Sequence, residues 1–148
     1  MHPPSPVHKV LSAGVVIVHH DGARYRLLCL RKFDSWDFPK AEVENEAEAL
    51  ATATAAAESE ARLGDLAFHW GEEHRETVAF DDGRVSRYYL AQSASPEVVM
   101  NTPAGADAEE DYEYRWATVD EAEDILPPRL AIVLDWAART LAGGIARR

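Results

Sequence analysis

The chain has 148 residues, 47% of them hydrophobic, and its formal net charge at pH 7 is −11. This length and hydrophobic content predict one domain, residues 1–148, with its own core. The negative charge excludes a protein that coats nucleic acid by general electrostatic attraction. No apolar run is long enough to cross a bilayer, and the first residues lack the apolar centre of a signal peptide, so we expect a cytoplasmic protein.

The first part of the chain predicts a pair of strands. Residues 10–20 are rich in valine and isoleucine, which favours a strand. Asp21-Gly22 predicts a turn into a partner strand over residues 25–32. Cys29 lies in the apolar run LLCL of this second strand, and we expect it to be a small buried side chain without a disulfide partner.

A long alanine-rich helix is predicted next. Asn45 is a good helix cap, and Glu48 three residues later suits its reciprocal partner. The helix is expected to run to Leu63 and to end at Gly64, because glycine is the usual residue just after a helix.

Strand patterns then return. Residues 66–80 and 84–92 predict two strands, which Asp-Asp-Gly at residues 81–83 would join by a turn. Residues 93–109 are acidic and rich in turn formers, so they predict a long mobile loop.

The end of the chain predicts one more strand and two helices. Residues 113–119 favour a strand, and Thr118 with Glu121 predicts the capped start of a short helix. Pro127-Pro128 opens a final helix, whose single apolar face is formed by Leu130, Val133, Leu134, Ala137 and Leu141. The order of strands, helix, strands and helix predicts an α/β fold, a mixed sheet with helices on both faces.

Residues 36–64, WDFPKAEVENEAEALATATAAAESEARLG, resemble a Nudix box. The pattern of that family is a glycine, five residues, a glutamate, seven residues, Arg-Glu, an aliphatic residue, any residue, Glu-Glu, any residue and glycine. Its helical glutamates hold divalent metals against a pyrophosphate while water attacks phosphorus. When the last glycine of the pattern is aligned with Gly64, Glu58 is the only helical glutamate of the pattern that this chain has. When the pattern is aligned instead on WDFPK, its first glycine falls on Ala41. The distance from Ala41 to Gly64 is then two residues longer than the pattern allows, which predicts an insertion.

Helical geometry limits what the remaining acids can do. At 3.6 residues per turn, Glu58 and Glu60 lie on opposite flanks of the helix, so they cannot share one metal ion. Glu58 and Arg62 have the spacing of an ion pair on one flank. We expect this pair in preference to metal binding by Glu58 alone.

Other segments resemble the diadenosine tetraphosphate hydrolase branch of the Nudix superfamily. SAGVVIV is similar to its first strand, WDFPK to the entry of the box, SRYYLA to the central strand, and EDYEYRWATVDEA to the approach to a short helix. The resemblance implies a Nudix-type α/β/α sandwich with a central mixed β-sheet. It also implies a small-molecule nucleotide as ligand and Mg²⁺ or Mn²⁺ as cofactor.

The resemblance assigns roles to individual residues. It implies that Lys40 and Arg87 bind phosphate, the latter bidentately, against the alternative that both are solvated surface cations. Tyr88 and Tyr114 match aromatic residues near the nucleotide site of the family, although core packing is the more common role of such rings.

The same resemblance makes Glu58 and Glu110 the candidate catalytic acids and metal ligands. Glu110 lies in an acidic run, EEDYE, so a solvated acidic surface is an equal alternative for it.

Three functions follow from these observations. The first is a metal-assisted Nudix hydrolase that cleaves the pyrophosphate bond of a nucleoside or dinucleoside polyphosphate, weakened by the lost box acids. The second is a catalytically inactive nucleotide-binding or regulatory module. The third is an unrelated acidic α/β interaction domain, in which the order of the matching segments is coincidence.

Overall fold

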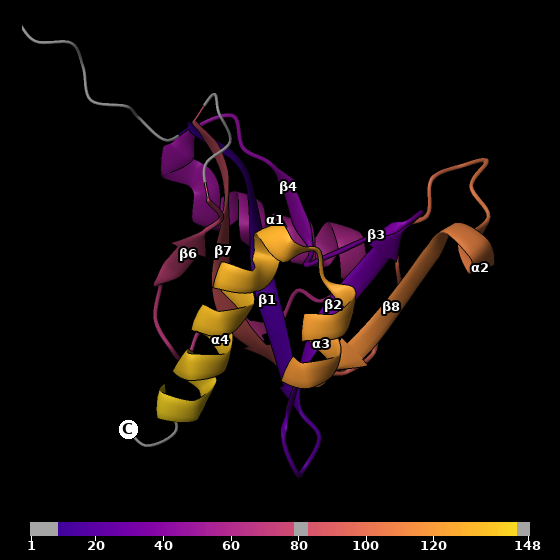
Figure 1. Cartoon of the computed structure of the whole chain (residues 1–148). Coiled ribbons are helices and arrows are strands. Elements are labelled where there is room, and N and C mark those ends of the chain that lie inside the picture. The colour runs from indigo at the N-terminus through magenta and orange to yellow at the C-terminus, as the bar shows by residue number, and fades with distance from the viewer. Residues whose placement is uncertain (1–8, 79–82, 145–148) are drawn as a thin grey trace, which may run out of the picture.

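The computed structural model describes residues 9–78 and 83–144 (Figure 1). Its strands form one eight-stranded sheet. They are β1 (Lys9–His20), β2 (Tyr25–Lys32), β3 (Ser35–Asp37), β4 (Lys40–Glu42), β5 (Leu66–Ala67), β6 (His74–Glu76), β7 (Arg84–Ser93) and β8 (Tyr112–Ala117). The helices are α1 (Ala49–Ala61), α2 (Ala108–Asp111), α3 (Val119–Ile125) and α4 (Ala131–Gly144), with 3₁₀ turns η1 (Glu46–Glu48) and η2 (Pro128–Leu130). No helix of the described ranges is both long and apolar enough to span a membrane.

Strand β1 is the centre of the sheet. It runs parallel to β7 on one side, and on the other it pairs antiparallel first with β4 and then with β2. Strand β2 in turn pairs antiparallel with β3 and β8. The sheet is therefore mixed, as predicted. Residues 13–18 of β1 are all buried, which explains why their sequence is a nearly continuous apolar run.

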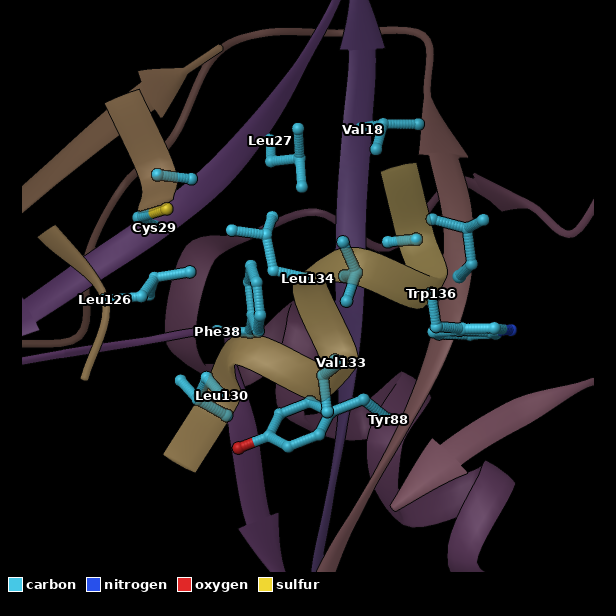
Figure 2. Packing of buried hydrophobic residues seen from close by; sticks show 14 of the residues in the cluster. Val18, Leu27, Cys29, Phe38, Tyr88, Leu126, Leu130, Val133, Leu134 and Trp136 are labelled. Carbon is cyan, nitrogen blue, oxygen red and sulfur yellow. The ribbon is translucent and has the colours of Figure 1, made fainter. Parts of the chain in front are cut away.

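Helices cover both faces of the sheet (Figure 1). Helix α1 packs on one face, against a cluster that includes Val15, Ile17, Leu28, Leu30 and Tyr89. Helices α3 and α4 lie on the opposite face, where Figure 2 shows α4 packed over the sheet with side chains that include Val18, Leu27, Phe38, Tyr88, Leu130, Val133, Leu134 and Trp136. The predicted α/β/α sandwich is confirmed, and all five residues predicted for the apolar face of the last helix are buried.

Local signals set most element boundaries. The side chain of Asn45 accepts a hydrogen bond from the Ala47 N–H, as expected for a cap. Thr118 and Glu121 exchange the two hydrogen bonds of a capping box, at 3.2 and 2.8 Å. Residues 79 and 80 of the strand predicted over residues 66–80 lie outside the described residues, and the described part is divided into β5 and β6 because Gly71, with φ 85°, turns the chain between them. Of the turn predicted at residues 81–83, residues 81 and 82 lie outside the described residues.

The predicted end of the long helix is wrong. Helix α1 ends at Ala61, and its C-cap is Arg62 in the left-handed conformation, with φ 59° and ψ 33°. The Arg62 N–H donates to the carbonyls of Ala57 and Glu58, so this residue closes the last turn. Gly64 lies two residues further on and is not the cap.

Candidate functional site

A basic pocket of about 250 Å³ lies where strands β2, β3 and β4 meet the last turn of α1 and the turn η2. We call it the Asp37 pocket. Three of its lining residues are cations and two are acids, so its formal charge is +1 in a chain of net charge −11. The lining residues are Leu30, Lys32, Ser35, Asp37, Phe38, Lys40, Glu60 and Arg129.

Asp37 organises this pocket. One carboxylate oxygen accepts hydrogen bonds from the Tyr88 hydroxyl at 2.8 Å and from the Phe38 N–H at 2.7 Å. The other accepts one from Arg129 at 2.7 Å and pairs with Lys40 Nζ at 3.0 Å. Three segments that are distant in sequence, residues 37–40, β7 and η2, meet at this carboxylate. The ring of the buried Tyr88 lies in the core (Figure 2), so its hydroxyl ties Asp37 to the core. Lys40 and Arg129 are thereby held at the pocket with defined positions.

A second ion pair crosses the pocket. Lys32, at the end of β2, pairs with the carboxylate of Glu60, on the last turn of α1. The Glu60 side chain is 16% exposed and that of Lys32 is 43% exposed. A carboxylate as buried as this one needs a compensating charge, and the Lys32 ammonium provides it.

The pKa shifts follow the charges of the pocket. Burial raises the pKa of the Tyr88 hydroxyl, and the charge of Asp37 adds to the effect, so the hydroxyl stays protonated and donates. Burial alone would lower the pKa of Arg129, but the hydrogen bond from Arg129 to Asp37, the charge of Asp37 and the nearby Tyr88 together outweigh burial and raise this pKa. Burial lowers the pKa of Lys32, which Asp37 opposes and the charge of Lys40 reinforces. A bound anion would favour the charged form of Lys32.

Gly14 allows the pocket to form at the sheet. It is paired with Lys40 on one side and with Tyr88 on the other. A Cβ atom at Gly14 would lie 2.2 Å from the Pro39 carbonyl oxygen and 2.8 Å from Lys40 Cβ. Only glycine lets the chain that carries Lys40 approach β1 so closely.

The helix cap corrects the register of the Nudix-like segment. When Arg62 takes the place of the last glycine of the pattern and Ala41 that of the first, the spacing fits and no insertion remains. The cap conformation of Arg62 is the one that glycine adopts most easily, which explains a glycine at this point of the pattern. In this register Glu60 matches the second residue of the Glu-Glu pair, whereas Glu58 falls on an unspecified position.

Glu58 and Glu60 lie in different surroundings, which confirms that they occupy opposite flanks of α1. Glu58 lines a separate cavity of about 450 Å³ with Ser59, Arg62 and residues 99–102. Its carboxylate lies over Gly64. Within the described part of the chain no ion pair joins Glu58 to Arg62, so the predicted pair is not formed.

Glu110 is not placed beside Glu58. It belongs to α2, which lies next to the start of β8, at the end of the sheet away from α4 (Figure 1). The Glu110 N–H donates to Asp107 and its carbonyl accepts from Arg31, while the side chain is exposed. Neither cavity beside α1 includes Glu110. The two predicted catalytic acids therefore do not form a common site.

The acids that the structure describes in and around the pocket do not fit a divalent metal site. Among the described residues, no group of three or more His, Cys, Asp or Glu side chains could hold a metal ion. The two acids of the pocket, Asp37 and Glu60, are already paired with lysine or arginine. The donor set that Mg²⁺ or Mn²⁺ prefers, several free oxygens, is missing here.

Of the two predicted phosphate cations, Lys40 lies in the Asp37 pocket and Arg87 does not. Arg87 donates two hydrogen bonds to Glu76, at 2.9 and 2.7 Å, and one to Glu46 at 3.1 Å. Its cavity also contains Glu72. Acids outnumber cations around Arg87, which disfavours a phosphate there.

The predicted stacking residues also differ from each other. Tyr88 is fully buried, with its ring edge-on to Phe38, so its face is not available to a nucleotide base. Its actual role is to hold Asp37. Tyr114 is 43% exposed, but it lines a different cavity with Tyr112 and residues 98–100.

Of the five charged residues that line the pocket, sequence reasoning assigned only Lys40 to the site and missed Lys32, Asp37, Glu60 and Arg129. Asp37 is a loop acid in WDFPK, and its position between the matching residues was the signal that could have identified it. Arg129 lies 92 residues from Asp37, and nothing in the local sequence joins them.

Neither a protein-family model nor a curated protein matches this chain. Solved structures match it along most of its length. An Ap4A hydrolase from C. elegans in a binary complex has a TM-score of 0.72 and 20% identity, covering 89% of this chain and 98% of that one. A Nudix hydrolase from Listeria monocytogenes gives 0.66 and 18%, covering 90% and 95%. The Nudix domain of Shewanella oneidensis NrtR, complexed with ADP ribose, gives 0.60 and 10%, covering 90% and 87%. The chain therefore has the Nudix fold, and the resemblance to Ap4A hydrolases is confirmed at the level of the fold.

Proposed function

We propose that this protein binds the polyphosphate chain of a nucleoside or dinucleoside polyphosphate in the Asp37 pocket, as a Nudix-type protein whose hydrolytic activity is strongly reduced. The observation that carries this proposal is the convergence of Lys32, Lys40 and Arg129 in one cavity of an otherwise acidic protein. The likeness to structures whose names include Ap4A hydrolase and an ADP ribose complex supports a nucleotide as the ligand.

The ion pairs of the pocket leave it able to hold phosphate. An ammonium has three donors and a guanidinium has five, so one carboxylate does not use all the donors of Lys32, Lys40 or Arg129. Phosphate oxygens accept charge-assisted hydrogen bonds, which contribute about 1.5–3 kcal/mol each when partly desolvated. The three side chains are 33 to 43% exposed, so an incoming ligand can reach them.

Reduced hydrolysis follows from the residues that occupy the box. In the register that Arg62 defines, the pattern's acids fall on Ala47, Ala56 and Ser59, and Glu60 alone is retained. Loss of one preorganised group that stabilises developing charge typically lowers kcat by about 10² to 10³. Several such groups are missing here, so slow cleavage or none is expected.

Active metal-assisted hydrolysis is the second candidate. It is favoured by Glu60, which keeps a box position and faces the same pocket as Lys40. For this function a metal ion would have to displace Lys32 from Glu60. The two candidates therefore differ in whether magnesium is needed.

Binding is tested by calorimetric titration of diadenosine tetraphosphate and of a nucleoside triphosphate, in EDTA and at fixed salt. Lys40→Ala is expected to weaken binding by about tenfold, because it removes one charge-assisted contact. The matched control is Arg139→Ala, which removes a cation from the exposed face of α4, where it pairs with Asp135. Equal affinity of wild type and Lys40→Ala, or no binding by wild type, would overturn the proposal and favour an interaction domain.

Hydrolysis is tested by phosphate release from the same nucleotides with Mg²⁺ and with Mn²⁺. We expect turnover far below one per second, against the 1–10³ s⁻¹ that is typical of enzymes. Rapid turnover that Glu60→Gln abolishes would establish the second candidate instead.

A further inference from the structure

We infer that the Asp37 pocket is selective for metal-free polyphosphate, with the ammonium of Lys32 standing beside Glu60 in place of a divalent cation. Magnesium then competes with the protein for the ligand and does not bridge the two. This inference rests on the proposed function and adds to it the ionic form of the ligand.

The first support is the pair between Lys32 and Glu60. It spans the pocket from the end of β2 to the last turn of α1, and the carboxylate that it neutralises is mostly buried. Glu60 is the one acid that α1 directs into this pocket. A metal ion could use Glu60 only by expelling a cation that is already bound to it.

The second support is the saturation of Asp37, the other acid of the pocket. Its two oxygens accept from Tyr88 and the Phe38 N–H and bind Lys40 and Arg129. A metal ion placed here would lie beside the positive charges of Lys40 and Arg129, and both oxygens of Asp37 already have partners. Repulsion between like charges in a partly buried site disfavours such an arrangement.

The third support is the charge balance. The pocket has three cations and two acids, so its formal charge of +1 suits an anion. A bound magnesium ion neutralises two negative charges of a polyphosphate and coordinates some of its oxygens. The complex is thus attracted less by the same cations and offers them fewer acceptors.

The test is titration of the wild-type protein with ATP and with inorganic tripolyphosphate, in EDTA and in saturating MgCl₂, with NaCl adjusted to equal ionic strength. We expect affinity in MgCl₂ to be weaker by about tenfold or more. Equal or tighter binding in MgCl₂ would overturn this inference and leave the proposed function standing. Absence of binding under both conditions would overturn both.

Two variants sharpen the result. Glu60→Gln removes a negative charge while it keeps the shape of the side chain, so metal-free affinity should rise severalfold, and binding in MgCl₂ should not be lost. If Glu60 is a metal ligand, the same change will instead weaken binding in MgCl₂. Glu58→Gln is the matched control, because Glu58 lies on the same helix but lines a different cavity. It should leave both affinities unchanged, and an effect equal to that of Glu60→Gln would contradict the placement.

Discussion

Replacing Arg62 by glycine is expected to stabilise the protein. Arg62 ends α1 with φ 59° and ψ 33°, a conformation in which an L side chain crowds the backbone. Its side chain is exposed, and no described ion pair involves it, so little is lost when it is removed.

The magnitude follows from two opposing contributions. Left-handed backbone costs a non-glycine residue about 1–2 kcal/mol, which glycine avoids. Glycine also gives the unfolded chain more freedom, which costs about 0.5–1 kcal/mol on folding. The difference leaves a net stabilisation of about 0.5–1 kcal/mol. For a domain of this size, this corresponds to a rise in Tm of about 1–4 °C.

The assay is urea unfolding followed by circular dichroism, with Gly64→Ala as the comparison. Gly64 is absent from the glycines with positive φ, and a Cβ there would meet only the carboxylate end of Glu58, 2.8 Å away, which is free to move. Gly64→Ala should therefore change the free energy of unfolding by less than about 0.5 kcal/mol. If Arg62→Gly destabilises the protein and Gly64→Ala costs more than about 1 kcal/mol, Gly64 is the cap and the box contains an insertion after all.

Two further predictions concern the core. Gly14→Ala should destabilise the protein by about 3 kcal/mol or prevent folding, because the new Cβ would lie 2.2 Å from the backbone oxygen of Pro39. The control is Gly143→Ala in α4, where the space around the Cβ is open. In the same urea assay this variant should be neutral or slightly stabilising. Burial raises the pKa of the Cys29 thiol from 9.0 to about 12, so the unfolded chain loses this proton first as pH rises. The free energy of unfolding should therefore fall as pH rises between those two values. Urea titrations at several pH values should show a smaller fall for Cys29→Ala. If the dependence on pH is the same in the variant and the wild type, burial does not raise the pKa of this thiol.

The fold was predictable because its signals are local. The valine-rich run that became β1 and the Thr118–Glu121 capping box each specify backbone conformation within a few residues. The apolar spacing of the last helix specified which face is buried, and Leu130 to Leu141 obey it. Such signals depend on the spacing of apolar residues and on hydrogen bonds between residues that are close in sequence. They are therefore retained when the residues of the functional site change.

The site was less predictable because it depends on contacts between distant segments. Arg87 was correctly placed on a strand, but its sequence neighbours do not reveal that Glu76 lies opposite it in the β6–β7 pair and occupies its guanidinium. Tyr88 was likewise placed correctly, yet only the packing of α4 on the sheet shows that its ring is enclosed. Alternation along one strand indicates which side chains share a face, not what covers that face.

The register of the box failed for a different reason. Glycine is the usual residue at a helix end, so the sequence favours Gly64 as the cap over the strained Arg62. A residue that departs from the local preference carries no sequence signal of its own. The corrected register changes the chemistry, because it moves the retained acid from Glu58 to Glu60 and so into the pocket of Lys40.

The proposed function assigns anion binding and metal binding to different residues, the cations around Asp37 and the acids of α1. The cations Lys40 and Arg129 are positioned by Asp37, which is held from the core by the Tyr88 hydroxyl of β7. The metal-binding capacity of a Nudix box depends instead on acids along α1, which can be replaced by alanine without disturbing the face that packs on the sheet. Under the proposed function, loss of those acids removes metal chemistry, and anion recognition by Lys40 and Arg129 remains. Because Asp37 is already paired with Lys40 and Arg129, pairing with Lys32 is the arrangement that compensates the buried charge of Glu60.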